Sequence, residues 1–158
     1  SQSIHTVKVT SATEMYEACL NHFSKADITV MAAAIADYMP QDFSSKKIKK
    51  TDDIFTLTLK KTKDVLKQLA QQKNKDQIIV GFALETNNEK ENALSKLKKK
   101  NIDLIVLNSL NDKGAGFGTD TNKIAIFDKH GNEFHFETKS KKLIAKDIVN
   151  TIIQYKNA

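Results

Sequence analysis

Residues 27–50 read DITVMAAAIADYMPQDFSSKKIKK and contain the only proline of the chain, Pro40. The apolar run Ile28–Met31 predicts a central, parallel strand, because a strand buried on both faces need not alternate. Three alanines follow, and small residues at the carboxyl end of such a strand let a ligand approach the backbone. Asp37 then offers a carboxylate, and four lysines between positions 46 and 50 could fold over an anion. The same pattern equally describes a strand that leaves the core into a solvated basic loop.

Outside this stretch, apolar periodicity predicts alternating strands and helices. Further strands are expected at 5–9, 55–59, 77–81 and 102–107, and a hairpin at 123–127 and 133–136. Helices are expected after Ser11, after Thr62 or Asp64, over 88–100, and after Ser140. Strands separated by helices, with an antiparallel hairpin late in the chain, indicate one α/β domain with a mainly parallel sheet.

The composition excludes several classes of protein. The 158 residues are 40% hydrophobic and 28% charged, and no apolar run approaches the roughly 20 residues of a membrane span. The net charge of +6 raises nucleic acid as a partner, but all 25 basic residues are lysines, and arginine dominates specific base recognition. We therefore expect no nucleic-acid partner, no membrane and a cytoplasmic location. The single cysteine, Cys19, cannot form an internal disulfide and is expected to be a buried structural thiol.

Polar and aromatic residues follow the ends of the three predicted central strands. Asp37 follows the first, Phe82 the second and Asn108 the third. Because parallel strands end at one edge of the sheet, these residues predict a nucleotide pocket. Phe82 could stack on a base, while Asp37 or Asn108 could bind a base edge or a ribose. Each also has a structural explanation: a core aromatic, a turn residue before Pro40, and a satisfied strand-end amide.

Two further features bear on phosphate binding. Lys96 and Lys100 are spaced i, i+4 and share one face of a helix, where an anion could lie between them, although a solvated basic helix explains the same run. The glycine-rich segment Gly114–Gly118 does not fit a dinucleotide motif, because Thr119 stands at the sixth position and no helix is predicted to follow. We interpret that segment as a loop.

Six motifs together resemble those of the phosphopantothenate–cysteine ligases, the CTP-using synthetases of coenzyme A biosynthesis. They cover nearly the whole chain in family order: TSATEM, AAAIADYMP, KIKK, VGFALETN, KLKKKNIDLIVLN and GFGTDTN. The resemblance implies a Rossmann-like three-layer sandwich. It also implies that CTP, with Mg²⁺, activates the carboxylate of 4′-phosphopantothenate as an acyl-cytidylate, and that L-cysteine then displaces CMP. A choice of CTP over ATP comes from the resemblance alone.

The resemblance also assigns residues. Lys47 corresponds to a lysine implicated in formation of the acyl-cytidylate, where its ammonium would offset the charge developing on the phosphates. Ala34 corresponds to a backbone position that lines the site of this intermediate. The nucleotide-contacting positions are Asp37, Lys47, Lys63, Asp64, Val65, Leu66, Phe82, Lys96 and Lys100. Asn108 is a possible addition from our reading of the strand ends, and the resemblance identifies no metal ligand.

Several positions depart from the family pattern. Lys63 stands where the family has proline, Leu84 where it has alanine, and Met39 where arginine is frequent. Nothing matches the glycine-rich opening of the family, or its arginine- and asparagine-bearing loop. The resemblance therefore implies the C-terminal part of an incomplete ligase domain, inactive alone if that segment is required.

The resemblance further implies partners. It implies a homodimer formed through this domain, and association or fusion with a phosphopantothenoylcysteine decarboxylase, whose FMN belongs to a domain that is not in this chain. The alternative hypothesis is a non-catalytic fragment that binds nucleotides or partner chains.

Overall fold

The structure is a computed structural model, and it describes residues 3–42, 44, 46–49, 54–109 and 119–158. The helices are α1 (Ala12–Phe23), α2 (Val65–Gln72), α3 (Glu89–Lys100) and α4 (Lys141–Asn157). The strands are β1 (Ile28–Met31), β2 (Tyr38–Pro40), β3 (Leu59–Lys61), β4 (Ile78–Glu85), β5 (Leu104–Ser109), β6 (Thr121–Asp128) and β7 (Glu133–Ser140). The predicted Gly114–Gly118 loop lies outside the described residues.

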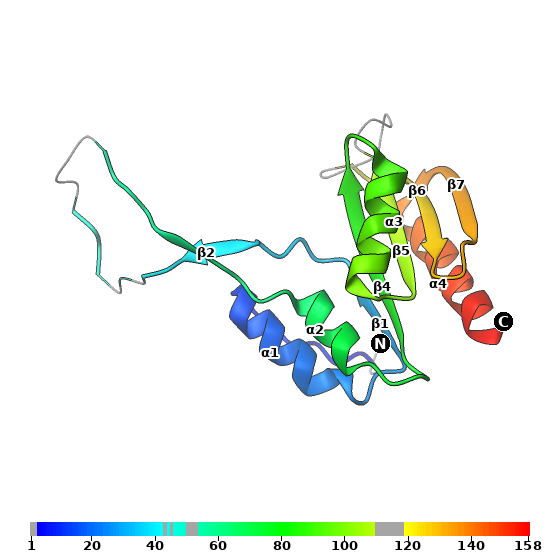
Figure 1. Ribbon diagram of the computed structural model, residues 1–158, viewed down its shortest axis with the longest axis horizontal. Coiled ribbons are helices and arrows are strands. Elements are labelled where there is room, and N and C mark those ends of the chain that lie inside the picture. Colours follow the sequence, from blue (N-terminus) through cyan, green and yellow to red (C-terminus); the bar gives the residue numbers. More distant parts are fainter. Residues whose placement is uncertain (1–2, 43, 45, 50–53, 110–118) are drawn as a thin grey trace.

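A five-stranded sheet in the order β1-β4-β5-β6-β7 forms the centre of the molecule (Figure 1). β1, β4 and β5 are parallel, whereas β6 and β7 form the antiparallel hairpin at the other edge. This arrangement confirms the predicted α/β class with a mainly parallel central sheet. It also brings the carboxyl ends of β1, β4 and β5 to one edge of the sheet.

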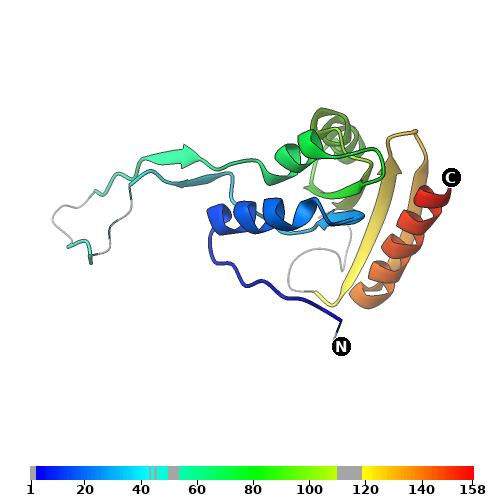
Figure 2. The same cartoon turned by 90° about the horizontal axis from the view of Figure 1, so that it is seen from below.

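Helices cover both faces of the sheet, which gives the three predicted layers. On one face, α1, α2 and α3 pack against the sheet. Their side chains Phe23, Leu69 and Leu97 belong to the same buried cluster as Ile79 and Ile105 of the sheet. On the other face, α4 supplies the apolar side chains Ile144, Ile148 and Ile152. Figure 2 shows α4 lying along the β6–β7 hairpin.

Local sequence explains where the helices begin. Ser11 accepts the Glu14 backbone N–H while the Glu14 carboxylate accepts the Ser11 N–H, the reciprocal capping box that the sequence predicted. Asp64 and Ser140 cap α2 and α4 by accepting the backbone N–H groups of Lys67 and Leu143. Of the two predicted starts for α2, the structure therefore selects Asp64 rather than Thr62.

Among the described strands, β2 and β3 pair only with each other. They form an antiparallel ribbon that begins after the loop following β1. We call this ribbon, with the described residues between its strands, the arm. Figure 1 shows the arm projecting far from the body of the molecule. Several of its apolar side chains are exposed: Tyr38, Ile48, Ile54, Phe55, Leu57 and Leu59.

Three expected strands differ from the structure. The strand predicted at 55–59 is instead Leu59–Lys61, and it pairs with β2 in a separate hairpin. Residues 5–9 are not a strand but an extended segment beside α1 and β1. The run after Asp27 forms an edge strand rather than a central one, and Ile28 and Val30 are 38% and 45% exposed. An apolar run indicates that a strand is buried, but it does not show whether the strand has a neighbour on one side or on both.

A buried carboxylate holds the amino-terminal end of the sheet together. The Asp103 side chain accepts hydrogen bonds from Lys73 Nζ at 2.6 Å, Lys129 Nζ at 2.8 Å and the Ile79 N–H at 2.8 Å. Tyr155 from α4 reaches the same carboxylate at 3.3 Å. Burial raises the pKa of Asp103, but the hydrogen bonds from Lys129 and Lys73 outweigh it, so the pKa lies below its ordinary value.

None of the helices in the described part of the chain is long and apolar enough to cross a membrane. Cys19 was expected to be buried, but it is only partly buried: it packs beside the core, with its Sγ 3.8 Å from Met15 Sδ, and lines the groove beside β1.

Candidate functional site

A pocket of about 460 Å³ lies at the carboxyl ends of β1, β4 and β5. Its lining residues are Ala32, Ala33, Ala34, Ile35, Asp37, Phe82, Ala83, Leu84, Lys96, Asn108, Asn122 and Lys141. Five residues predicted from the sequence, Ala34, Asp37, Phe82, Lys96 and Asn108, are therefore brought together here from four separate parts of the chain. A larger groove of about 550 Å³ runs beside β1, but mainly apolar side chains line it, and we regard the polar pocket as the better candidate for chemistry.

The wall from β1 is backbone rather than side chain. Ala32–Ala34 have almost no side chain, so a ligand can come close to the peptide groups there. Thr62 holds the following turn, because its Oγ1 donates to the Ala36 carbonyl at 2.6 Å and its N–H donates to the Asp37 carbonyl at 2.9 Å. These bonds place the exposed carboxylate of Asp37 at the rim of the pocket.

Phe82 and Lys96 form a connected unit. Phe82 is partly buried and packs against the α4-side core. Lys96 extends from α3, and its Nζ donates to the Phe82 carbonyl at 2.7 Å. The ammonium group is thereby fixed at the pocket that Phe82, the residue predicted to contact a base, also lines.

Two amides line the opposite wall. Asn122 Nδ2 donates to Asn108 Oδ1 at 3.0 Å, and the Lys123 N–H donates to Asn122 Oδ1 at 3.0 Å. The β6–β7 register shifts between Asn122 and Ile124, and such irregularities re-aim side chains near functional sites. Asn122 is only 8% exposed, so this pair is a built feature of the pocket wall.

The pocket is positively charged overall. Lys96 and Lys141 contribute two ammonium groups, against the single carboxylate of Asp37 among the described lining residues. Lys141 opens α4 directly after its cap, where the helix dipole also favours negative charge. The electrostatics therefore suit an anionic ligand that also carries a planar apolar group.

Sequence reasoning missed Asn122 and Lys141. Asn122 had a signal, since it ends the GFGTDTN motif, but the spacing did not show that it returns to Asn108. Lys141 had a weaker signal. It follows the predicted helix cap Ser140, but most residues after a helix cap bind no ligand.

Other predicted residues do not line this pocket and lie at α2, α3 and the segment before α2. Lys63 Nζ lies 4.5 Å from the centre of the Tyr16 ring, Val65 is buried in the core, and Leu66 packs against that core. Asp64 caps α2 and pairs with Lys100 of α3. Burial raises the pKa of Asp64, but the hydrogen bonds from Lys100 and the Lys67 N–H lower it below its ordinary value. In this structure the Lys96 and Lys100 side chains therefore serve different partners.

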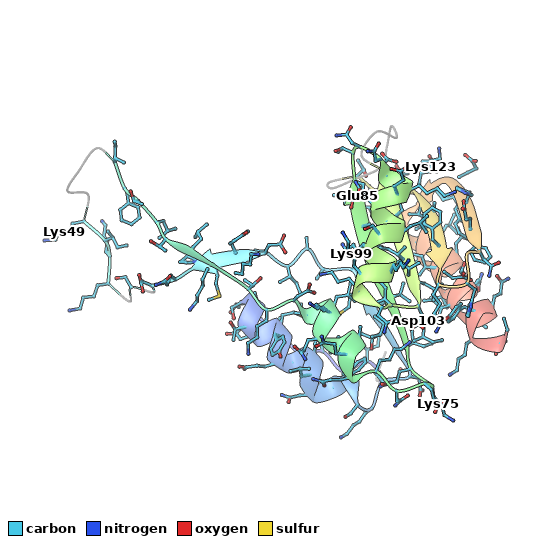
Figure 3. The ribbon with its side chains drawn as sticks, viewed as in Figure 1. Lys49, Lys75, Glu85, Lys99, Asp103 and Lys123 are labelled. Carbon is cyan, nitrogen blue, oxygen red and sulfur yellow. The ribbon has the colours of Figure 1, made fainter. Side chains whose placement is uncertain are left out.

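Lys47 lies on the arm rather than in the pocket. Figure 3 labels its neighbour Lys49 near the tip of the arm, far from Glu85 at the end of β4. The structure therefore does not bring Lys47 to the pocket of its own chain, and its role stays a prediction.

Residues 1–155 match the family described as the DNA/pantothenate metabolism flavoprotein C-terminal domain. The chain belongs to this family. A cysteine/cysteine sulfinic acid decarboxylase from an unknown prokaryotic organism is 49% identical over 153 residues, which are 97% of this chain and 43% of that protein. The coenzyme A biosynthesis bifunctional protein CoaBC of Bacillus subtilis (strain 168) is 43% identical over 146 residues, which are 92% of this chain and 36% of that protein.

A solved structure is also similar to this chain. The crystal structure of the C-terminal domain of a coenzyme A biosynthesis bifunctional protein CoaBC superposes with a TM-score of 0.74 at 36% identity, over 94% of this chain and 66% of that one. The chain thus spans less than half the length of the two curated relatives, and the activities of those whole proteins are not automatically its own.

Proposed function

We propose that this chain forms the site of a phosphopantothenate–cysteine ligase in coenzyme A biosynthesis. The reaction joins 4′-phosphopantothenate to L-cysteine after CTP has activated the carboxylate as an acyl-cytidylate. The observation that carries the proposal is the pocket, where an aromatic ring, two lysines, a carboxylate and two amides converge at the ends of three parallel strands. The likeness to CoaBC proteins supports the same reaction.

The pocket residues suit distinct parts of the nucleotide. Phe82 offers a ring face for the base, while Lys96 and Lys141 offer positive charge for phosphates. Asp37 is the one carboxylate among the described lining residues. This fits Mg²⁺, which commonly takes one or two protein carboxylates together with substrate phosphates. When bound, Mg²⁺ would neutralise phosphate charge during acyl-cytidylate formation.

The name of the decarboxylase relative does not favour decarboxylation by this chain. The match covers 43% of that protein, so its activity can reside in the rest of it.

We further propose that the protein acts as a homodimer in which the arm of one copy supplies Lys47 to the pocket of the other. The arm points away from its own body (Figure 1) and exposes Phe55, Leu57 and Leu59. A projecting ribbon with exposed apolar side chains is suited to pairing with a second chain. Burial on a partner would remove this surface from water and would carry the basic tip toward the second pocket.

A complementation experiment tests the reaction and the shared site together. K47A and F82A each remove one essential part, and each variant alone should form little phosphopantothenoylcysteine. Heterodimers purified through two different tags should recover about half of the wild-type rate, because one of their two pockets is complete. Mass spectrometry of the product, with pyrophosphate release, provides the measurement.

The outcomes separate the two proposals. If the wild-type protein forms product but the heterodimers stay as inactive as the single variants, Lys47 acts within its own chain and the shared site is wrong. If neither this chain nor a form extended at its amino terminus by the family's glycine-rich segment forms product with CTP, 4′-phosphopantothenate and L-cysteine, the proposed reaction is contradicted.

A further inference from the structure

The orientation of the Asn108 amide follows from a chain of hydrogen bonds. The Lys123 backbone N–H can only donate, so the Asn122 atom 3.0 Å away must be the carbonyl oxygen. Asn122 therefore turns its NH₂ group toward Asn108, and the Asn108 atom 3.0 Å away must be an acceptor. The carbonyl oxygen of Asn108 is thus engaged by Asn122, and the group that Asn108 has left to present is its NH₂.

The Asn108 amide lies beside Phe82 on the same face of the sheet. Phe82 is paired with Val106, and Leu84 with Asn108, so Asn108 lies two positions beyond the partner of Phe82. Because side chains alternate along a strand, Asn108 shares the face of Val106, which packs into the same α4-side cluster as Phe82. Diagonal neighbours on adjacent strands are about 7–8 Å apart, which is within reach of an aromatic side chain. A planar ring stacked on Phe82 would direct one edge toward Asn108.

We infer that Asn108, positioned by Asn122, selects cytosine over uracil by donating hydrogen bonds to the acceptor edge of the base. Cytosine carries neighbouring acceptors at O2 and N3, which match a donor-only amide. Uracil carries an N–H at position 3, which would face the Asn108 NH₂ with no acceptor between them. A site built around one hydrogen-bonding pattern rejects the opposite pattern, because buried polar groups are left unpaired.

This inference rests on the proposed nucleotide and adds the residues that read its base. Asn108 contacts the base and is the specificity-determining residue. Asn122 is a positioning residue, because it acts only through the orientation of Asn108.

Two substitutions invert the hydrogen-bonding pattern by different routes. In N122D, one carboxylate oxygen still accepts the Lys123 N–H, and the other accepts the Asn108 NH₂, so Asn108 turns its carbonyl toward the pocket. In N108D, one oxygen still accepts from Asn122, and the second faces the pocket as an acceptor. Both variants therefore replace a donor with an acceptor at the same point.

The measurement is calorimetric titration of the wild-type protein and both variants with CTP, UTP and ATP, in the presence of Mg²⁺. The wild-type protein should prefer CTP to UTP by about tenfold or more, and each variant should reduce that ratio by about tenfold. An added negative charge would weaken both nucleotides alike, so the ratio isolates base recognition. Q71E, at an exposed position of α2, makes the same change of charge and should leave the ratio unchanged. Thermal unfolding checks that each variant folds, and either variant alone decides the role of Asn108.

Several results would overturn the inference. A wild-type preference for CTP that both folded variants retain within about twofold contradicts the amide pair while leaving the proposed nucleotide intact. If the wild-type protein prefers CTP to ATP but binds CTP and UTP equally, the role of the amide pair is likewise contradicted and the proposed nucleotide is again left intact. Loss of the preference in N108D but not in folded N122D contradicts the role given to Asn122. Equal binding of all three nucleotides by the wild-type protein contradicts the inference and the proposed nucleotide together.

Discussion

Replacement of Asp103 by alanine is expected to lower the free energy of unfolding by about 3–5 kcal/mol, the cost of removing one partner from a buried ion pair. The Asp103 side chain is 2% exposed, and the paired Lys73 side chain is 14% exposed, so the lysine would lose its partner with little water to replace it. Lys129 is 46% exposed and can turn to solvent, which places the expected value toward the lower end. Urea denaturation of D103A and the wild-type protein provides the measurement.

The pH dependence of this difference has a definite sign. The folded-state pKa of Asp103 lies below its ordinary value, so its stabilisation is present above the unfolded pKa of about 3.9 and is lost as the pH falls through the folded pKa. The gap between D103A and the wild-type protein should therefore narrow in acid. D147A, which breaks the more exposed Lys139–Asp147 pair, should cost only about 0–1 kcal/mol. Equal losses in D103A and D147A near neutral pH would contradict the structural role of Asp103.

Replacement of Phe82 by alanine is expected to weaken CTP binding by about 1–3 kcal/mol, or roughly 5- to 150-fold, the range found for base–aromatic stacking. The ring lines the pocket, and its backbone carbonyl holds Lys96. F82L is the matched control, because leucine keeps most of the packing against the α4-side core but has no planar face. Calorimetric titration should show F82L weakened almost as much as F82A. An F82L protein that binds CTP like the wild type would contradict stacking.

Much of the fold was predictable because its signals are local. The capping residues Ser11 and Ser140 precede apolar periodicity, and the helices begin where those signals stand. The position of β1 at an edge was not predictable in the same way. Ile28 and Val30 are residue types typical of buried strands. Their exposure depends on which segments pack against β1, and the spacing of apolar residues does not show this.

The candidate site was also predictable only in part. Asp37, Phe82 and Asn108 were found because each follows the end of a predicted strand, and parallel strand ends share an edge. In the structure β4 and β5 continue further, to Glu85 and Ser109, so Phe82 and Asn108 lie within the last residues of their strands. Lys47 was expected at the pocket, but the sequence could not show that the segment carrying it projects as a ribbon.

Contacts between residues far apart in the sequence left no pattern in it. Asn122 meets Asn108 across 14 positions, and Asp103 meets Lys73 across 30. Such pairs are set by strand register and loop geometry rather than by spacing along the chain.

The most direct test of the central claim is calorimetric titration of the wild-type protein with CTP and Mg²⁺ at moderate salt, with ATP as the control. Selective binding of CTP is the predicted result, and the F82A variant should bind CTP about 5- to 150-fold more weakly. Absence of CTP binding, or equally weak binding of CTP and ATP, would contradict the assignment of the pocket at the strand ends as a cytidine nucleotide site.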